Sequence, residues 1–314
     1  MRVITSAPQQ SPARVHPGSR PPLVAAVVQT RWHADAAEHA AVLDDGIRTA
    51  ADRGAQVVVL SELTLSRYPA DTLPDGDATA TAEDLATGPT YTMAAKAAAD
   101  HGIAVHASLY ERADGPDGLG YNTAILVAPD GALLGRTRKM HIPISAGYYE
   151  DHYFRPGPAG GEPHPVLDLP GEHRARLGLP TCWDQWFPEL ARAYSLRGAE
   201  VLAYPTAIGS EPDFPDFDTE PLWRQVIVGN GIANGTFMAV ANRWGDEGTI
   251  TFYGSSFISD PYGRVLVSAP RDADAVLVAT LDLDQRRDWL GLFPFLETRR
   301  PESYGVLTEP AKRG

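Results

Sequence analysis

The 314-residue chain is predicted to be an α/β protein with mixed β-sheets. Short apolar runs typical of buried strands alternate with helix-length stretches that carry apolar residues on one face. Two pairs of strand-like runs are joined by turn sequences, Pro-Asp-Gly at 129–131 and Asp-Pro-Tyr-Gly at 260–263, which predict antiparallel hairpins. Hydrophobic residues make up 43% and charged residues 21%, the balance of a globular protein with a sizeable core. Alternation and hairpins together predict sheets with both parallel and antiparallel pairs.

The elements follow one another in a regular order. Pro188 stands where a proline suits the first turn of a helix, so a helix is expected to begin there. Proline and acidic residues crowd 71–84 and 211–221, which are the predicted surface loops. The predicted strands are 23–30, 54–63, 102–111, 176–182, 200–207, 236–245 and 275–283, the hairpins 121–141 and 252–269, and the helices 34–53, 91–101, 187–199 and 223–234.

The chain is expected to consist of a short leader and one domain. Residues 1–22 are rich in Pro, Ser and Arg and lack an apolar run, so a disordered leader is predicted rather than a signal peptide. Residues 23–314 are predicted to form a single domain with a C-terminal tail. No segment approaches the roughly 18 consecutive apolar residues of a membrane helix, and a cytoplasmic location is expected.

Composition and motifs argue against several classes of protein. The net charge of −13 argues against nucleic-acid binding. Nine histidines contain no HExxH pair, so no metal site is predicted. The glycines of 229–235 lie in a helical stretch with the wrong spacing for a nucleotide loop, and no G-x-S-x-G motif indicates a serine hydrolase.

Three residues near predicted strand ends could act together. Cys182, the only cysteine, stands where a strand ends and a helix soon begins; alone it could be a small buried filler. Glu62 ends a strand and could be a capping carboxylate, and Lys139 leaves a hairpin and could be a surface charge. Together they could form a thiol nucleophile, a base that activates it and a cation that stabilises an oxyanion.

The sequence around these residues resembles the nitrilase superfamily of carbon–nitrogen hydrolases. The motifs are LSELTLSRYP around Glu62, GRTRKMHIP around Lys139 and LPTCWDQWFPE around Cys182. Further segments, GYYEDHYFRPG, GAEVLAYPTAIGSEP and ITFYGSSFISDPYG, are similar to the N-carbamoylputrescine amidase branch. The resemblance implies a four-layer α-β-β-α sandwich, no cofactor, and homo-oligomers (dimers or larger) that associate through the helical layer.

The resemblance also implies a role for each site residue. Glu62 would remove the proton from Cys182, whose thiolate attacks an amide or ureido carbonyl. Lys139 and the backbone N–H of Trp183 would stabilise the oxyanion, and Glu150, which matches a second glutamate of the family's site, would orient Lys139. The implied reaction cleaves a small N-carbamoyl amine to the amine, ammonia and carbon dioxide.

Residues that select the substrate are predicted less directly. Gln185 and Trp186 stand where relatives that act on D-amino-acid derivatives carry arginines, which argues against a substrate carboxylate there. Ile144 and Ser145 stand where acidic residues would be expected to meet a distal ammonium. The acids Asp213, Asp216, Asp218 and Glu220 are alternative ammonium partners, and the expected substrate-binding residues are Tyr68, Tyr110, His141, Trp183, Trp186 and Thr206. Alternatively, the substrate carries a larger or less basic amine in an aromatic pocket that also includes Phe214.

Several functions stay open at this point. The same Glu-Lys-Cys triad would serve a carboxamide amidase, a nitrilase, or a β-ureidopropionase whose carboxylate anchor is Arg67, Arg243 or a residue elsewhere in the chain. A non-catalytic assembly protein on the same fold would instead be expected to have a disrupted triad.

Overall fold

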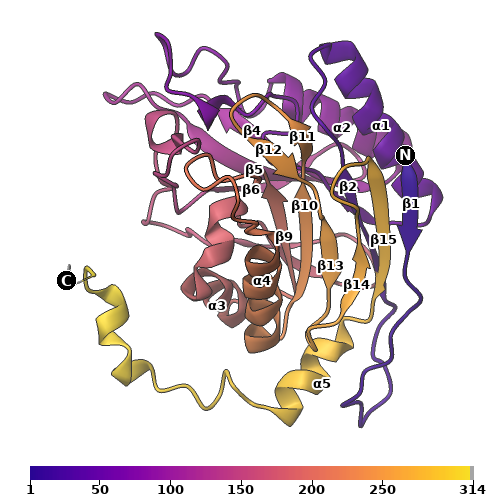
Figure 1. Cartoon of the computed structure of the whole chain (residues 1–314). Coiled ribbons are helices and arrows are strands. Elements are labelled where there is room, and N and C mark those ends of the chain that lie inside the picture. The colour runs from indigo at the N-terminus through magenta and orange to yellow at the C-terminus, as the bar shows by residue number, and fades with distance from the viewer. Residues whose placement is uncertain (312–314) are drawn as a thin grey trace.

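Two β-sheets lie face to face and carry helices on their outer surfaces (Figure 1). The structure, a computed structural model, describes residues 1–311. The helices are α1 (Ala36–Asp52), α2 (Pro89–His101), α3 (Pro188–Leu196), α4 (Glu220–Asn234) and α5 (Asp284–Leu292), with short 3₁₀ turns η1 (Pro69–Asp71), η2 (Glu150–His152), η3 (Cys182–Trp186), η4 (Pro301–Ser303) and η5 (Gly305–Thr308).

The first sheet has seven strands in the order β1-β15-β2-β3-β4-β5-β6. Strands β2, β3 and β4 pair in parallel, whereas β5 and β6 form the predicted antiparallel hairpin, with Gly131 at φ +86° in its turn. Their bounds are β1 (Arg2–Thr5), β2 (Leu23–Gln29), β3 (Val57–Val59), β4 (Ala104–Glu111), β5 (Tyr121–Val127), β6 (Leu133–Arg138) and β15 (Ala275–Leu281).

The second sheet has six strands in the order β14-β13-β10-β9-β8-β7 and is also mixed. Its bounds are β7 (Val166–Asp168), β8 (Arg176–Gly178), β9 (Val201–Thr206), β10 (Phe237–Asn242), β13 (Phe257–Ser259) and β14 (Val265–Ser268). The strand predicted over 236–245 is interrupted after Asn242, because β11 (Trp244–Asp246) leaves the sheet and pairs with β12 (Thr251–Tyr253) in a separate ribbon.

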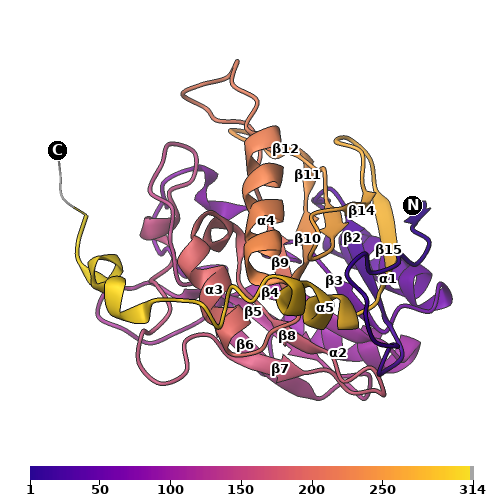
Figure 2. The same cartoon turned by 90° about the horizontal axis from the view of Figure 1, so that it is seen from below.

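Apolar side chains from both sheets form one central core, including Val27, Leu126 and Leu177. Helices α1 and α2 cover the outer face of the first sheet. Helices α3 and α4 cover the outer face of the second sheet (Figure 2). The predicted four-layer α-β-β-α arrangement with two mixed sheets is confirmed.

The first 22 residues differ from the disordered leader expected from their composition. Strand β1 pairs in parallel with β15 at the edge of the first sheet. Arg14 pairs with Asp282 and Asp288, and Arg20 pairs with Glu200. The arginines that suggested disorder are therefore held by carboxylates distant in sequence, which composition alone does not reveal.

The C-terminal segment after α5 extends away from the layered body (Figures 1 and 2). Among the described residues, no helix is long and apolar enough to cross a membrane.

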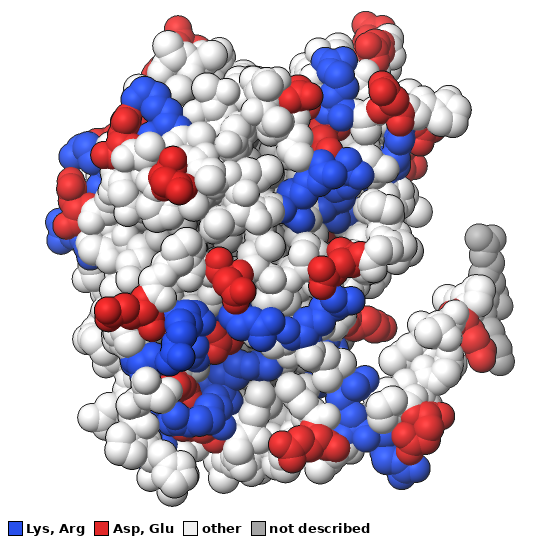
Figure 3. Space-filling view, turned by 180° about the vertical axis from the view of Figure 1, so that it is seen from behind, with Lys and Arg blue, Asp and Glu red and all other residues white. Residues whose placement is uncertain are grey.

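On the face shown in Figure 3, Lys and Arg gather in a band that Asp and Glu border and interrupt. Among the ion pairs of the protein, Glu111 pairs with both Arg136 and Arg138.

His106 lies on the face of β4 that points between the two sheets, two residues after the core residue Ala104. The side chain is 0% exposed, and among the described residues neither ring nitrogen has a hydrogen-bond partner. Burial lowers the pKa of His106 from its ordinary value to about 3. The folded protein therefore keeps this ring neutral at pH values where the unfolded chain protonates it.

This difference predicts a loss of stability in acid. Between pH 6.5 and 3 the unfolded chain binds one more proton than the folded protein at this site, so the free energy of unfolding falls by up to about 1.4 kcal/mol per pH unit. Replacing His106 with leucine is expected to remove that contribution. Urea unfolding at pH 7, 6, 5 and 4 tests it, with the exposed His152→Asn as control. If the free energy of unfolding changed equally with pH in H106L and in the unmodified protein, the prediction would be contradicted.

Candidate active site

The three residues singled out near strand ends meet in the structure. Glu62 follows β3, Lys139 directly follows β6, and Cys182 begins η3 after β8. All three are buried, with 0%, 1% and 6% of their surface exposed. Strands from both sheets therefore contribute to one site.

One carboxylate oxygen of Glu62 is held by two donors. Its Oε1 accepts from Lys139 Nζ at 2.9 Å and from Asn122 Nδ2 at 2.7 Å. Its Oε2 is buried and has no hydrogen-bond partner among the described residues. An unpartnered, buried carboxylate oxygen is able to accept a proton from a neighbouring group.

Lys139 lies between two carboxylates. Its Nζ donates to Glu150 Oε1 at 2.9 Å and to Oε2 at 2.7 Å, in addition to Glu62. Burial alone would lower the pKa of Lys139, but the carboxylates of Glu150 and Glu62 outweigh it and raise the pKa above its ordinary value. The side chain is therefore a fixed ammonium ion.

Glu150 is the second carboxylate of this cluster and belongs to η2. Its Oε1 also accepts from the Tyr68 hydroxyl at 2.8 Å. Burial raises the pKa of Glu150 to about 7, although the Lys139 ammonium opposes this shift. Glu150 reaches the pocket described below, whereas Tyr68, predicted to bind substrate, is 0% exposed and lies behind it.

Cys182 occupies a sharp turn between strand and helix. Its φ of +41° lies in the left-handed region, which a non-glycine residue adopts only at a cost of about 1–3 kcal/mol. Asp184 holds the turn, since its carboxylate accepts from the N–H of Thr181 at 3.0 Å and from the N–H of His141 at 3.0 Å. The same carboxylate thus connects the cysteine turn to the segment that follows Lys139.

The surroundings of the thiol favour its protonated form. Burial raises the pKa of Cys182 well above its ordinary value, the Glu62 charge raises it further, and the Lys139 ammonium opposes both. A neutral thiol must lose its proton before it can act as a nucleophile. The Glu62 carboxylate, whose charge acts on this thiol, has one oxygen without a hydrogen-bond partner among the described residues. The Sγ atom also lies 3.8 Å from the carbonyl oxygen of Ala207.

A cavity of about 350 Å³ opens onto Cys182. Of the side chains predicted to bind substrate, Trp183, Trp186 and Phe214 line it. Two further lining residues, Tyr148 and Glu211, were not singled out in the sequence, although both belong to the quoted motifs GYYEDH and GSEP. The remaining lining residues are Pro143, Ser145, Glu150, Ala207, Ile208, Phe217, Thr219 and Leu222.

Three other predicted substrate-binding residues do not line this cavity. Tyr110 is buried in the fold and donates to the carbonyl of Tyr153 at 2.7 Å. His141 contacts Asp184 through Nδ1 at 2.8 Å. The Thr206 hydroxyl accepts from the Gln185 side chain at 2.7 Å. These side chains are occupied by internal contacts, which the sequence pattern does not show.

Gln185 itself is 1% exposed and also accepts from Trp223 Nε1 at 2.7 Å. It therefore faces the protein interior and not the substrate, and of the Gln185–Trp186 pair only Trp186 reaches the cavity. Of these two side chains, only Trp186 stands where an arginine could contact a substrate carboxylate in the cavity.

The acidic residues proposed as ammonium partners lie outside the cavity. Asp218 pairs with Arg271 and Glu220 with Arg224, and neither Asp213 nor Asp216 is among the lining residues. The carboxylate that does line the cavity is Glu211. Of the acids in this loop, Glu211 and none of the four predicted residues lines the cavity.

Glu211 has few partners. Burial raises its pKa above the ordinary value, and the Thr219 hydroxyl opposes that shift. Within residues 1–311 no Lys, Arg or His side chain forms an ion pair with it; its one side-chain hydrogen bond is from Thr219 Oγ1 at 3.4 Å. It is a half-buried carboxylate without a cation.

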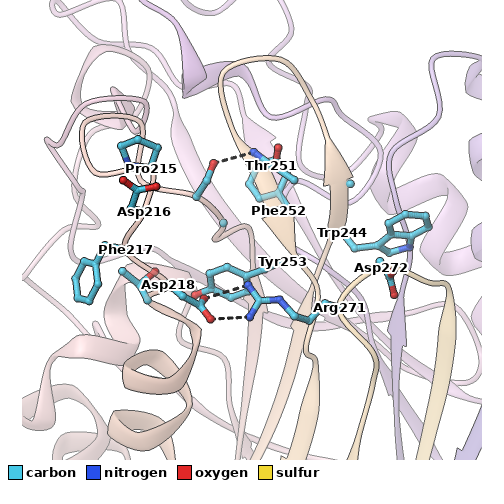
Figure 4. A pocket seen from close by; sticks show the side chains of 14 residues that line it. Pro215, Asp216, Phe217, Asp218, Trp244, Thr251, Phe252, Tyr253, Arg271 and Asp272 are labelled. Carbon is cyan, nitrogen blue, oxygen red and sulfur yellow. Dashed lines mark hydrogen bonds and ion pairs between the residues drawn. The ribbon is translucent and has the colours of Figure 1, made fainter.

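The loop that carries Glu211 also borders a second cavity, of about 640 Å³ (Figure 4). Figure 4 shows Asp218 bound to Arg271 by two hydrogen bonds, of 2.9 and 3.0 Å, across this cavity. Phe217 and Thr219 line both cavities. The ion pair therefore ties the outer side of the loop to the segment before β15.

Neither arginine considered as a carboxylate anchor is free to serve. Arg67 pairs with Asp71, and Arg243 is 2% exposed and pairs with Glu247. Neither lines the cavity at Cys182, and no Lys, Arg or His does. Nor do the described residues contain a group of three His, Cys, Asp or Glu side chains able to hold a metal ion.

Comparison with known proteins agrees with this geometry. The model of the carbon-nitrogen hydrolase family matches residues 24–290. The chain is 39% identical to a citrullinase of Francisella tularensis, covering 89% of this chain and 96% of the relative. It is 36% identical to an N-carbamoylputrescine amidase of Arabidopsis thaliana, with 92% and 96% covered.

Solved structures show the same fold. A carbon-nitrogen hydrolase from Helicobacter pylori G27 superimposes with a TM-score of 0.81 at 30% identity, covering 92% of this chain and 99% of that one. A variant of the amidase from Nesterenkonia sp. AN1, with acrylamide added to its active-site cysteine, has a TM-score of 0.71 at 27% identity, with 91% and 99% covered. This chain belongs to the carbon–nitrogen hydrolase family, whose members hydrolyse non-peptide C–N bonds.

Proposed function

We propose that this hydrolase cleaves the carbamoyl C–N bond of a small N-carbamoyl amine whose far end carries a positive charge. The observation that carries the proposal is a single cavity with Cys182 and Glu150 at one end and the unpaired carboxylate of Glu211 on its wall. Cys182 and Glu150 provide the reacting groups, and Glu211 selects a substrate with a positive charge.

In the first half-reaction, Glu62 Oε2 accepts the proton of Cys182 and Sγ attacks the ureido carbonyl carbon. Negative charge then develops on the carbonyl oxygen. The Lys139 ammonium stabilises it together with the N–H of Trp183, the second residue of η3, since N–H groups in the first turn of a helix lack intrahelical partners. Glu150 and Glu62 keep the ammonium in place.

In the second half-reaction, Glu62 returns its proton to the departing nitrogen, and the C–N bond breaks to leave a thioester on Sγ. Glu62 then takes a proton from water, whose oxygen attacks the thioester carbonyl carbon; the C–S bond breaks and Glu62 returns this proton to Sγ. The carbamic acid formed decomposes, so the sum is one ureide and one water giving the amine, ammonia and carbon dioxide.

The lining of the cavity favours a cationic amine over an amino acid. Trp183, Trp186 and Phe214 provide aromatic walls, which attract both alkyl chains and cations. Glu211 provides a charge opposite to that of an ammonium. A β-ureido acid would bring a carboxylate into a cavity whose lining contains no Lys, Arg or His.

A second candidate substrate is citrulline, because a citrullinase is 39% identical to this chain. The α-ammonium of citrulline could contact Glu211 as well. Its α-carboxylate would find no lining cation, so we consider citrulline a weaker candidate than a carbamoyl diamine.

Homo-oligomer formation and a cytoplasmic location stay predictions.

A turnover screen distinguishes these substrates. N-carbamoylputrescine, citrulline, β-ureidopropionate and butyramide would each be assayed for ammonia and for carbon dioxide. We expect the highest kcat/KM for the carbamoyl diamine, with equimolar carbon dioxide. Ammonia from butyramide alone, without turnover of any ureide, would show a carboxamide amidase instead.

The Glu211→Gln variant tests the charge contact. Loss of the negative charge at position 211 is expected to lower kcat/KM for the carbamoyl diamine about 10–100-fold, since a charge-assisted contact contributes roughly 1.5–3 kcal/mol. Turnover of the uncharged butyramide should change less than about threefold. Asp213→Asn, an exposed acid of the same loop, is the matched control. An equal loss for charged and uncharged substrates would contradict the assignment.

A further inference from the structure

Arg243 follows β10 and is among the largest fully buried side chains of the protein. Its Nη1 donates to both oxygens of Glu247, at 2.8 and 3.0 Å. The two side chains are 2% and 3% exposed. A buried ion pair is costly to desolvate and adds little net stability compared with apolar residues, so stability alone does not explain it.

The other nitrogen of the guanidinium, Nη2, binds the backbone at Glu62, the proposed base. Nη2 donates to the carbonyl oxygen of Glu62 at 2.6 Å and to that of Leu63 at 3.1 Å. Both nitrogens also contact the carbonyl of Ser66 at 3.2 Å. Leu63 has a φ of +48°, a left-handed conformation unfavourable for this residue. Arg243 therefore stabilises an unusual turn immediately after Glu62.

Glu247 extends the same network to the second carboxylate. Its Oε2 accepts from the backbone N–H of Tyr68 at 2.8 Å. The Tyr68 hydroxyl in turn donates to Glu150 Oε1 at 2.8 Å. Neither Arg243 nor Glu247 lines the cavity at Cys182, so both act at a distance from substrate.

We propose that the buried Arg243–Glu247 pair is a positioning unit that sets the orientation of both carboxylates of the site. Arg243 holds the main chain of Glu62, and Glu247 holds the main chain of Tyr68, whose side chain orients Glu150. Glu62 has only one oxygen free to reach the thiol, so a small rotation of its backbone moves that oxygen away from Cys182. A displacement of about 1 Å in such a group can cost ~10²-fold in rate.

The Arg243→Lys variant separates positioning from charge. Lysine keeps a cation for Glu247, but one ammonium cannot reproduce the planar fork that binds the two backbone carbonyls. We expect kcat to fall about 30–100-fold with KM within about threefold, because the lost contact affects reaction geometry more than binding. Retention of the fold would be checked by circular dichroism and thermal unfolding.

The proposal rests on the role of Glu62 as the base, so a second measurement is made without substrate. The rate at which iodoacetamide alkylates the single cysteine would be followed from pH 6 to 10. In R243K we expect slower alkylation at pH 7 and a profile displaced to higher pH. In the Glu62→Gln background the same Arg243→Lys change should have little further effect, because its action passes through Glu62.

Arg264→Lys is the matched control, since Arg264 also forms an i,i+4 pair with a buried acid, Asp260, but lies in the hairpin between β13 and β14. It should leave kcat and alkylation unchanged. Folded R243K with an unaltered alkylation profile would overturn the proposal, as would an Arg243→Lys effect of equal size with and without Glu62. If no compound tested is turned over but the alkylation cycle behaves as expected, the substrate proposal fails and the positioning proposal stands.

Discussion

Replacing Cys182 with alanine is expected to abolish turnover, lowering kcat by about 10⁴-fold or more. Cys182 is the only cysteine in the sequence, it lines the cavity, and the charge of Glu62, which has an unpartnered buried oxygen among the described residues, acts on its thiol. Cys182→Ser should be similarly inactive, because a hydroxyl is much harder to deprotonate than a thiol. Ammonia release under saturating substrate gives kcat for each variant.

Two controls accompany this experiment. Iodoacetamide should add a single adduct to the unmodified protein and none to C182A, as intact mass would show. The melting temperatures should stay close, because alanine removes only one atom from a residue that is 6% exposed. A Cys182→Ser variant with full turnover would rule out the mechanism for every candidate substrate.

Replacing Lys139 with methionine is expected to be the most damaging change that affects both activity and stability. Removing the ammonium leaves Glu62 and Glu150 buried without the cation they share. Breaking a buried ion pair in this way typically costs about 3–5 kcal/mol in the free energy of unfolding. Loss of an oxyanion donor lowers kcat by about 10²–10³-fold in addition. Urea unfolding and steady-state kinetics measure the two effects.

The free energy of unfolding of K139M is expected to depend on pH. Burial already raises the pKa of Glu150 to about 7 with the ammonium present, and loss of that cation raises it further. The folded variant then binds more protons than the unfolded chain above the ordinary pKa of a glutamate, so its stability falls as pH rises. The deficit relative to the unmodified protein should therefore be larger at pH 8 than at pH 5.

A second substitution keeps this prediction testable if K139M folds poorly. Lys139→Met combined with Glu150→Gln removes one of the two like charges and should recover part of the stability without restoring kcat. Lys96→Met, at an exposed lysine paired with Asp100, should change stability by less than about 0.5 kcal/mol. A K139M variant as stable as the unmodified protein at pH 8 would contradict the burial argument.

Much of the fold could be predicted because its signals are local. The alternation of apolar runs and amphipathic stretches indicated most strands and helices, and Pro188 marks the beginning of α3 as expected. The predicted strand over 236–245 failed where long-range contacts intervene: Asn242 binds the backbone at Ile208 and Gly254, and the chain leaves the sheet. The leader failed for the same reason, since its arginines bind carboxylates over 150 residues away.

For the candidate site as well, local motifs could be predicted from the sequence and tertiary contacts could not. Glu62, Lys139, Glu150 and Cys182 could be singled out as site candidates because their motifs are contiguous in sequence. Tyr110 and Thr206 were also predicted to bind substrate, yet in the structure they form internal hydrogen bonds. No property of an isolated tyrosine or threonine tells which neighbours it will meet.

By itself, the sequence determined the chemistry of this protein and the layers that carry it, because strand and helix periodicity and motif identity are properties of neighbouring residues. Only the tertiary structure decided which carboxylate lines the cavity at Cys182 and which side chains contact the backbone at Glu62. Glu211, rather than the acids that follow it, enters the cavity, and Arg243 turns inward to the backbone at Glu62. Both outcomes depend on segments over 25 residues apart in the chain packing against each other, and such contacts leave no pattern in any short stretch of sequence.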